Sequence, residues 1–177
     1  QRTGYICRGR APIIFNNMGD TYVQAYFHLV FAVKNRKALI KKEWKDELEK
    51  YITAIVQNNG HKLIAIGSVA DHIHIFIGYS LKQLIPDLVE DIKTSSNHWI
   101  TNKRLSFHKF NWQKGYGAFT VSHTQIDKVA QYVLNQEQIH ENRRFREEYL
   151  EILKNYDVDY KEPYLFEFFD DVYGWEN

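Results

Sequence analysis

Two histidines separated by a single residue, His72 and His74, have the clearest chemical potential in this sequence. The segment around them alternates like a β-strand, in which successive side chains point to opposite faces. His72 and His74 therefore share one face with Phe76, while three isoleucines share the other. Residues two apart on a strand lie about 7 Å apart along it. At that spacing both imidazoles can bind one metal ion or grip one phosphate, so the pair is a candidate site.

A second candidate group lies about sixty residues further on, in a segment with the apolar spacing of an amphipathic helix. Tyr132 and Gln136 are four residues apart, and such residues are neighbours on one helix face. Neither belongs to the apolar stripe, and His140 continues roughly the same line. A surface tyrosine beside a glutamine would produce the same pattern. The pair therefore becomes a site hypothesis only in company with the two histidines.

A long stretch without acidic residues, from Ile92 to Ile126, is the third notable feature. It interleaves basic residues with tryptophan, phenylalanine and tyrosine, a composition that suits a nucleic-acid backbone and unstacked bases. An aromatic core loop with solvated lysines is the competing interpretation. The candidate nucleic-acid-binding residues are Lys93, Lys103, Arg104, Lys109 and Lys114.

Length and composition favour one ordinary globular domain. The chain has 177 residues, 44% of them hydrophobic and 25% charged, and no apolar run reaches membrane-spanning length. Its single cysteine, Cys7, cannot form an internal disulfide, which fits a reducing compartment. Residues 1–17 carry three arginines and no acid, and Met18 follows. We expect residues 1–17 to be a non-native or disordered leader and residues 18–177 to form the domain.

The pattern of elements predicts an α+β fold. A strand over residues 21–34 precedes an amphipathic helix, and two strands over 61–70 and 71–79 form a hairpin. A second helix and a short strand over 116–122 follow, and further helices end the chain. The order β-α-β-β-α-β is the ferredoxin-like arrangement, also found in the RRM, with C-terminal helices appended. We expect two helices on one sheet face and an open opposite face that carries the histidines.

Three motifs give the chain a specific resemblance. The string DHIHIF ends the hairpin, FNWQKGYGAFTVS leads into the next strand, and VAQYVLNQ lies on the following helix, which precedes an acidic one. In this order they resemble the single-tyrosine HUH transposases of single-stranded-DNA insertion sequences, whose relatives include the transposases associated with repeated extragenic palindromes. The likeness extends over about residues 21–169. Histidine-hydrophobe-histidine alone is a weak signal, but it is strong in combination with Tyr-x-x-x-Gln.

The resemblance implies a role for each candidate position. His72, His74 and Gln136 correspond to the metal ligands, and Tyr132 corresponds to the nucleophile. Relatives often carry paired histidines after the glutamine, whereas Ile139 precedes His140 here, so the role of His140 stays open. The metal would be Mg²⁺ or Mn²⁺, since imidazole favours transition metals and Mg²⁺ favours oxygen.

The same resemblance implies an activity and partners. The protein would cleave and rejoin single-stranded DNA with hairpin ends through a 5′-phosphotyrosine intermediate. It would act as a homodimer with active sites shared between subunits. Its location would be the cytoplasm of a bacterium or archaeon, near the nucleoid and away from membranes.

Three other functions remain open from sequence. An RRM-like module would bind nucleic acid on strand aromatics, but histidines occupy the corresponding place here. A two-histidine phosphoesterase would require repeated His-x-Thr or His-x-Ser pairs, which His72-Ile73-His74 does not supply. An inactivated, domesticated transposase would bind hairpins without cleaving them.

Overall fold

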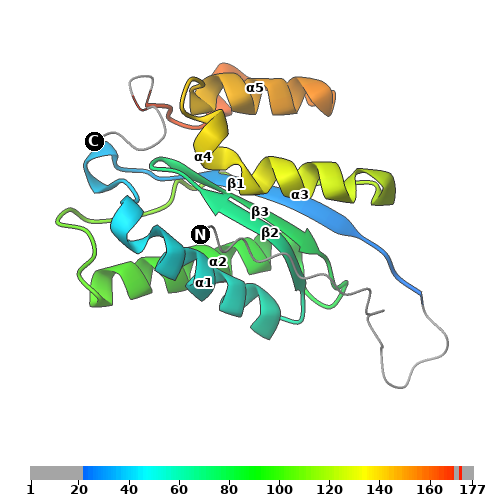
Figure 1. Ribbon diagram of the computed structural model, residues 1–177, viewed down its shortest axis with the longest axis horizontal. Coiled ribbons are helices and arrows are strands. Elements are labelled where there is room, and N and C mark those ends of the chain that lie inside the picture. Colours follow the sequence, from blue (N-terminus) through cyan, green and yellow to red (C-terminus); the bar gives the residue numbers. More distant parts are fainter. Residues whose placement is uncertain (1–21, 170–171, 173–177) are drawn as a thin grey trace.

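A four-stranded antiparallel sheet forms the centre of the computed structural model, which describes residues 22–169 and 172 (Figure 1). The spatial order is β2-β3-β1-β4. The strands are β1 (Tyr26–Ala32), β2 (Lys62–Ser68), β3 (His72–Gly78) and β4 (Gly117–Thr120). One helix follows β1 and another follows β3, so the order is that of the ferredoxin-like fold. The α+β class and the β2–β3 hairpin predicted from sequence are confirmed.

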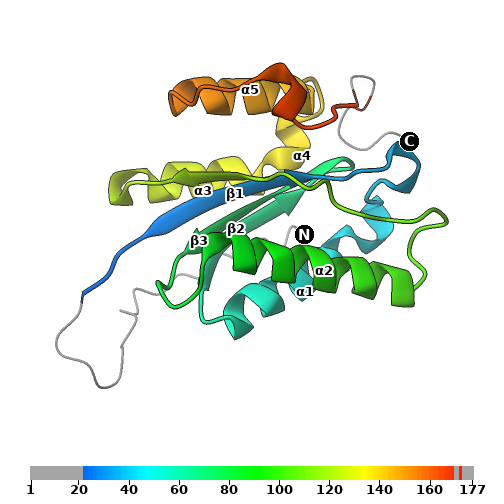
Figure 2. The ribbon, with the colours of Figure 1, turned by 180° about the vertical axis from the view of Figure 1, so that it is seen from behind.

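Helices α1 (Lys42–Asn58) and α2 (Ile85–Asn102) cover one face of the sheet (Figure 2). Their apolar stripes pack against the isoleucine face of β3, which is fully buried. Burying one such side chain contributes about 1.5–3 kcal/mol. The main core therefore lies on this side of the sheet. Its largest buried members on α1 and β3 are Leu48, Ile52, Ile73, Ile75 and Ile77.

Three further helices lie on the opposite face, as both ribbon views show (Figures 1 and 2). They are α3 (Ile126–Leu134), α4 (Gln136–Ile139) and α5 (Phe145–Asn155). Val133 of α3 packs in a small apolar cluster with Ala65 and Phe76 of the sheet. The expectation of an open histidine face is thus wrong. The apolar residues on that face provide a surface for α3, and the appended helices close over the histidines.

The close approach of α3 to β2 depends on Gly67. A β-carbon at this position would lie 2.0 Å from the backbone oxygen of Val133. Gly67 pairs with His74 across the hairpin, so both residues face α3. Any side chain at position 67 would lift the helix away from the histidine strand.

Element boundaries differ modestly from the predicted ones. β1 begins at Tyr26, five residues later than expected, and residues 1–17, the expected leader, lie outside the described part of the chain. The helix predicted through Gln136 is interrupted at Asn135, where φ is −97° and ψ is 17°. None of the described helices combines the length and apolarity required to cross a membrane. Short 3-10 turns occur at Arg36–Ala38, His123–Gln125 and Glu162–Tyr164.

Candidate active site

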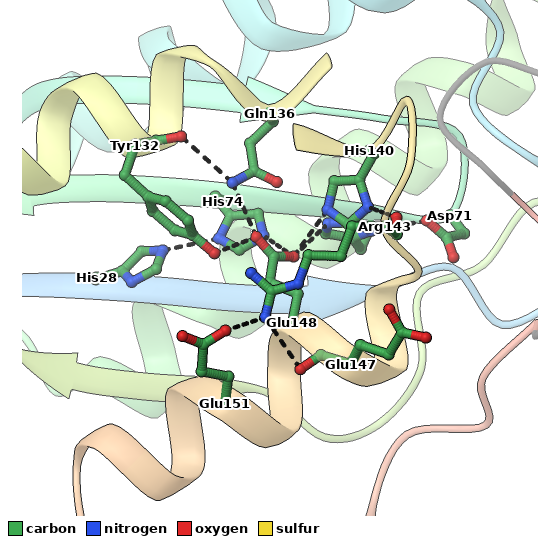
Figure 3. A network of polar contacts seen from close by, with 11 residues as sticks. His28, Asp71, His74, Tyr132, Gln136, His140, Arg143, Glu147, Glu148 and Glu151 are labelled. Carbon is green, nitrogen blue, oxygen red and sulfur yellow. Dashed lines mark hydrogen bonds and ion pairs between the residues drawn. The ribbon is translucent and has the colours of Figure 1, made fainter. Parts of the chain in front are cut away.

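The four side chains that the sequence singled out lie together in the structure, and Figure 3 labels three of them, His74, Tyr132 and Gln136. His72 and His74 are adjacent on β3, with ring centroids 5.0 Å apart. The Tyr132 ring on α3 meets His74 edge-on at 5.8 Å. Gln136, the first residue of α4, donates from Nε2 to the backbone oxygen of Tyr132 at 3.4 Å. The hairpin and the α3–α4 segment thus supply one cluster within a single chain.

A fifth residue, Glu148 of α5, places its carboxylate at the centre of this cluster (Figure 3). Its Oε2 lies 3.2 Å from Nε2 of His72 and 3.3 Å from Nε2 of His74. Its Oε1 accepts hydrogen bonds from the Tyr132 hydroxyl and from Nε2 of Gln136. All four candidate side chains therefore contact one carboxylate, which is fully buried.

Hydrogen bonds on the outer sides of the two imidazoles determine which nitrogens face that carboxylate. His72 donates from Nδ1 to Oδ1 of Asp71 at 2.7 Å, because an ionised carboxylate can only accept. Nδ1 of His74 shares a hydrogen bond of 2.8 Å with Nε2 of His28. Nε2 of each ring consequently points toward Glu148. Outer contacts of this kind orient histidines that bind metal ions.

His140 and Phe145 complete the surroundings. The sequence left the role of His140 open. Its Nε2 lies 2.9 Å from Oε2 of Glu148, and its Nδ1 donates to the backbone oxygen of Arg143 at 2.7 Å. The Phe145 ring stacks on His72 with centroids 3.9 Å apart. Both residues therefore restrict the position of the groups inside the cluster.

Burial and mutual contact shift the ionisation of these groups. Burial alone would raise the pKa of Glu148, but the surrounding imidazoles outweigh it and hold that pKa well below its usual range. Burial opposes the charge of His72, yet Asp71 and Glu148 outweigh it and raise the pKa to about 9. Burial and the adjacent imidazole lower the pKa of His28 to about 3, so His28 is neutral. Burial and the carboxylate raise the pKa of Tyr132 well above its ordinary value.

The donor atoms at the cluster suit a divalent metal ion. Nε2 of His72, Nε2 of His74 and Oε1 of Gln136 are buried without a hydrogen-bond partner among the described residues. Buried polar atoms normally have partners, so three orphans in one place require an explanation. Imidazole nitrogen and amide oxygen are both metal ligands. Candidate ligand atoms of His72, His74 and Glu148 also lie within 4.8 Å of one another. A bound cation would satisfy the two orphaned nitrogens.

Sequence reasoning did not identify Glu148, Asp71 or the contact of His140. One signal for Glu148 was present. Phe145, Tyr149 and Ile152 recur with helical spacing and are buried, and Glu148 lies within that stripe. An acid among apolar residues on one helix face is rarely buried unless it is paired. The identity of its partners required the tertiary structure.

Lys93, one of the five predicted nucleic-acid-binding residues, is engaged inside the protein. Its ammonium group donates to the backbone oxygens of Gln113, Lys114 and Gly115 at 2.8, 3.3 and 2.7 Å. It also lies 5.1 Å from the centroid of the Phe31 ring. Burial lowers its pKa to about 8. In this arrangement Lys93 holds the loop before β4, and its ammonium group is engaged by three backbone oxygens.

The other four predicted cations are exposed on the segment that joins α2 to β4. Lys103 pairs with Glu47 at 3.1 Å. Arg104 and Lys109 line a groove that also includes Phe107, whose side chain is 95% exposed. Lys114 follows on the same segment. The structure therefore keeps four of the five predicted cations accessible, on a segment separate from the histidine cluster.

A histidine-hydrophobe-histidine strand facing a tyrosine on a covering helix, in a ferredoxin-like fold, defines a single-tyrosine HUH transposase. The chain belongs to the IS200-like transposase family, because the family model described as "Transposase IS200 like" matches residues 21–136, more than half of the sequence.

Individual relatives agree with this family. The chain is 27% identical over 124 residues to the ISDra2 transposase TnpA of Deinococcus radiodurans, a match that covers 67% of this chain and 89% of the relative. A crystal structure of a transposase from the same organism is similar with a TM-score of 0.53 and 26% identity, covering 70% of this chain and 98% of the other.

A third likeness spans more of the chain. The structure of a REP-associated tyrosine transposase bound to a REP hairpin has a TM-score of 0.54 at 10% identity. It covers 92% of this chain and 99% of the other. At that identity the likeness concerns the fold, and it includes a larger share of this chain than the Deinococcus structure does.

Proposed function

We propose that this transposase cleaves and rejoins single-stranded DNA with hairpin ends through a 5′-phosphotyrosine on Tyr132. His72, His74 and Gln136 would hold the divalent cation, Mg²⁺ or Mn²⁺, that the reaction requires. One observation carries the proposal. The Tyr132 hydroxyl and Nε2 of both histidines meet at the same buried carboxylate, so the nucleophile lies beside the candidate metal ligands.

The bond changes in this reaction balance without an external energy source. The Tyr132 oxygen forms a bond to the scissile phosphorus, and the bond from phosphorus to the DNA 3′ oxygen breaks. The phenolic proton is transferred, in net terms, to the released 3′ oxygen. One phosphodiester is exchanged for another, so a later 3′-hydroxyl can reverse the step and join new ends. When bound, the cation would neutralise negative charge on the phosphate.

The surrounding residues hold the nucleophile in a resting state. The raised pKa of Tyr132 keeps its hydroxyl protonated, and that hydroxyl donates to Glu148. A phenol is a poor nucleophile until its proton is removed. Asp71 and His28 orient the two histidines from outside, which supports a fixed position for the scissile phosphate relative to the tyrosine.

Hairpin DNA is the proposed partner because a relative of the same fold is a transposase bound to a hairpin. In this chain the exposed residues that suit such a ligand are Lys103, Arg104, Lys109 and Lys114, with Phe107 available to stack on a base. The RRM-like alternative is less well supported, since α3 to α5 cover the sheet face on which an RRM stacks bases.

A homodimer with shared sites was the expectation from the resemblance. In the described chain Tyr132, His72 and His74 come from one subunit and contact the same carboxylate. This supports a tyrosine that acts on the metal site of its own chain, whether or not the protein dimerises.

The test is formation of a covalent protein–DNA adduct. The protein would be incubated with a pool of single-stranded DNA hairpins with randomised flanks, then run on a denaturing gel. We expect a labelled adduct with Mn²⁺ or Mg²⁺ and none with excess chelator. The Tyr132→Phe variant should form no adduct yet still shift the hairpins on a native gel. An adduct from this variant would rule out Tyr132 as the nucleophile, and an adduct in excess chelator would rule out the metal.

A further inference from the structure

The carboxylate of Glu148 has no assigned role, although it contacts every member of the candidate site. It lies on α5, beyond residues 21–136 that match the family model. We propose that Glu148 is a fourth protein ligand of the metal through Oε2, while Oε1 holds the Tyr132 hydroxyl. This inference rests on the proposed metal-dependent function and adds a residue to it.

The spacing of the atoms is that of ligands around one ion. Two ligand atoms bound at about 2.1 Å and at right angles to each other lie about 3.0 Å apart. In a tetrahedral site the same separation is about 3.4 Å. Oε2 of Glu148 lies 3.2 Å from Nε2 of His72 and 3.3 Å from Nε2 of His74, between those two values.

The orientation of the two imidazoles directs one nitrogen of each ring toward the proposed ion position. Nδ1 of His72 carries the proton that Asp71 accepts, so Nε2 is the ring nitrogen that faces Oε2 of Glu148, and this nitrogen must release its proton to bind an ion. Neither Nε2 of His72 nor Nε2 of His74 has hydrogen-bond geometry to any described residue. A divalent ion bound between these two nitrogens and Oε2 of Glu148 would take the place of imidazole protons as the positive charge beside the carboxylate.

The second carboxylate oxygen connects the metal site to the nucleophile. Oε1 accepts from the Tyr132 hydroxyl and from Nε2 of Gln136 at 3.1 Å (Figure 3). The bond from Nε2 of Gln136 leaves its Oε1 without a hydrogen-bond partner in the part of the chain that the structure describes. Glu148 would thereby fix the tyrosine oxygen beside the ion. A carboxylate would also make the ligand set richer in oxygen, which favours Mg²⁺ more than two imidazoles and an amide do.

Metal binding by the full-length protein without DNA tests the inference. Mn²⁺ and Mg²⁺ would be titrated by calorimetry into the parent, Glu148→Gln and Glu147→Gln. Glu147 is the matched control, because it is the neighbouring carboxylate on α5 and is exposed. We expect Glu148→Gln to weaken Mn²⁺ binding by about tenfold or more. The loss of Mg²⁺ affinity should be larger than the loss of Mn²⁺ affinity, because Mg²⁺ depends more on oxygen ligands. Glu147→Gln should bind both ions as the parent does.

Each other outcome has a definite meaning. Parent-like Mn²⁺ affinity in a folded Glu148→Gln variant would overturn the inference and leave the proposed function intact. Tighter binding would also overturn it, since Glu148 would then occlude the ion position. If the parent itself bound no Mn²⁺, both proposals would fail. Should Glu148→Gln not fold, Glu148→Asp withdraws the carboxylate by one methylene and must show the same direction of change.

Discussion

His28 shows how a residue outside the ligand set can control the site. It is buried and neutral, and its Nε2 contacts Nδ1 of His74 at 2.8 Å. We predict that His28→Phe lowers Mn²⁺ affinity by about 10–100-fold, because His74 loses the partner that orients its ring. Calorimetric titration of Mn²⁺ measures this change.

A second buried histidine provides the control for that experiment. His61 accepts from the backbone N–H of Ser80 at Nδ1 and contacts Gln83 at Nε2, away from the cluster. His61→Phe should lower the melting temperature while leaving Mn²⁺ affinity unchanged. Equal losses of affinity in both variants would mean that general destabilisation, rather than ring orientation, explains the effect of His28→Phe.

Lys93 and Lys109 were predicted to play the same part, and the structure separates them. We predict that Lys93→Met lowers stability by about 1–3 kcal/mol, because the backbone oxygens of Gln113, Lys114 and Gly115 lose their donor. Its salt dependence of hairpin binding should equal that of the parent. Lys109→Met should do the reverse, reducing the slope of log K against log salt by about 0.7 without loss of stability. Chemical denaturation measures the stability, and gel shifts at several salt concentrations measure the slope. A reduced slope in Lys93→Met would show that Lys93 contacts the DNA.

At the scale of elements, the spacing between α3 and β2 determines whether the tyrosine reaches the histidines. Gly67→Ala places a β-carbon 2.0 Å from the backbone oxygen of Val133, and backbone cannot yield as a side-chain tip does. We predict a loss of about 1–3 kcal/mol of stability from this overpacking. Adduct formation should fall by more than Mn²⁺ binding does, since the displaced segment carries the nucleophile Tyr132, whereas His72 and His74 keep their places on the strand.

Another strand glycine serves as the comparison for Gly67. A β-carbon at Gly78, at the end of β3, would come no closer than 3.4 Å to any neighbour. Gly78→Ala should therefore leave both stability and adduct formation close to the parent. If Gly67→Ala behaved like Gly78→Ala in melting and cleavage assays, helix spacing would not govern the site.

Strands and helices could be predicted wherever the sequence itself shows the alternation of a strand or the spacing of a helix. Alternation located β3 and placed His72 and His74 on one face, and helical spacing placed Tyr132 near Gln136. The covering of that face was not predictable, because α5 reaches it through tertiary packing that no single segment encodes. The same is true of Glu148, whose stripe position is visible in sequence but whose partners come from β3 and α3.

At the scale of the whole molecule, the origin of the tyrosine is the main question. A mixed dimer of a His72→Ala chain and a Tyr132→Phe chain separates the two possibilities. Because Tyr132 lies beside the histidines of its own chain, we predict that neither site is complete and that the mixed dimer forms no adduct. Denaturing gels with differently sized chains measure this, after size-exclusion chromatography has established that the two chains associate.

Activity in the mixed dimer would contradict the one-chain arrangement. In that case the labelled DNA should appear on the His72→Ala chain, whose tyrosine would complete the other subunit's site. The homodimers of each variant must be inactive for the comparison to hold, and a parent chain mixed with either variant provides the positive control.

The position of Glu148 on α5 has a consequence for anyone who wishes to shorten or transplant this protein. A chain cut at the end of the family match, residue 136, would keep the histidines, Tyr132 and Gln136. It would lose the carboxylate that they all contact and the Phe145 ring that stacks on His72. The smallest portable unit therefore extends through α5, to Asn155, and a fusion partner is better joined beyond that residue.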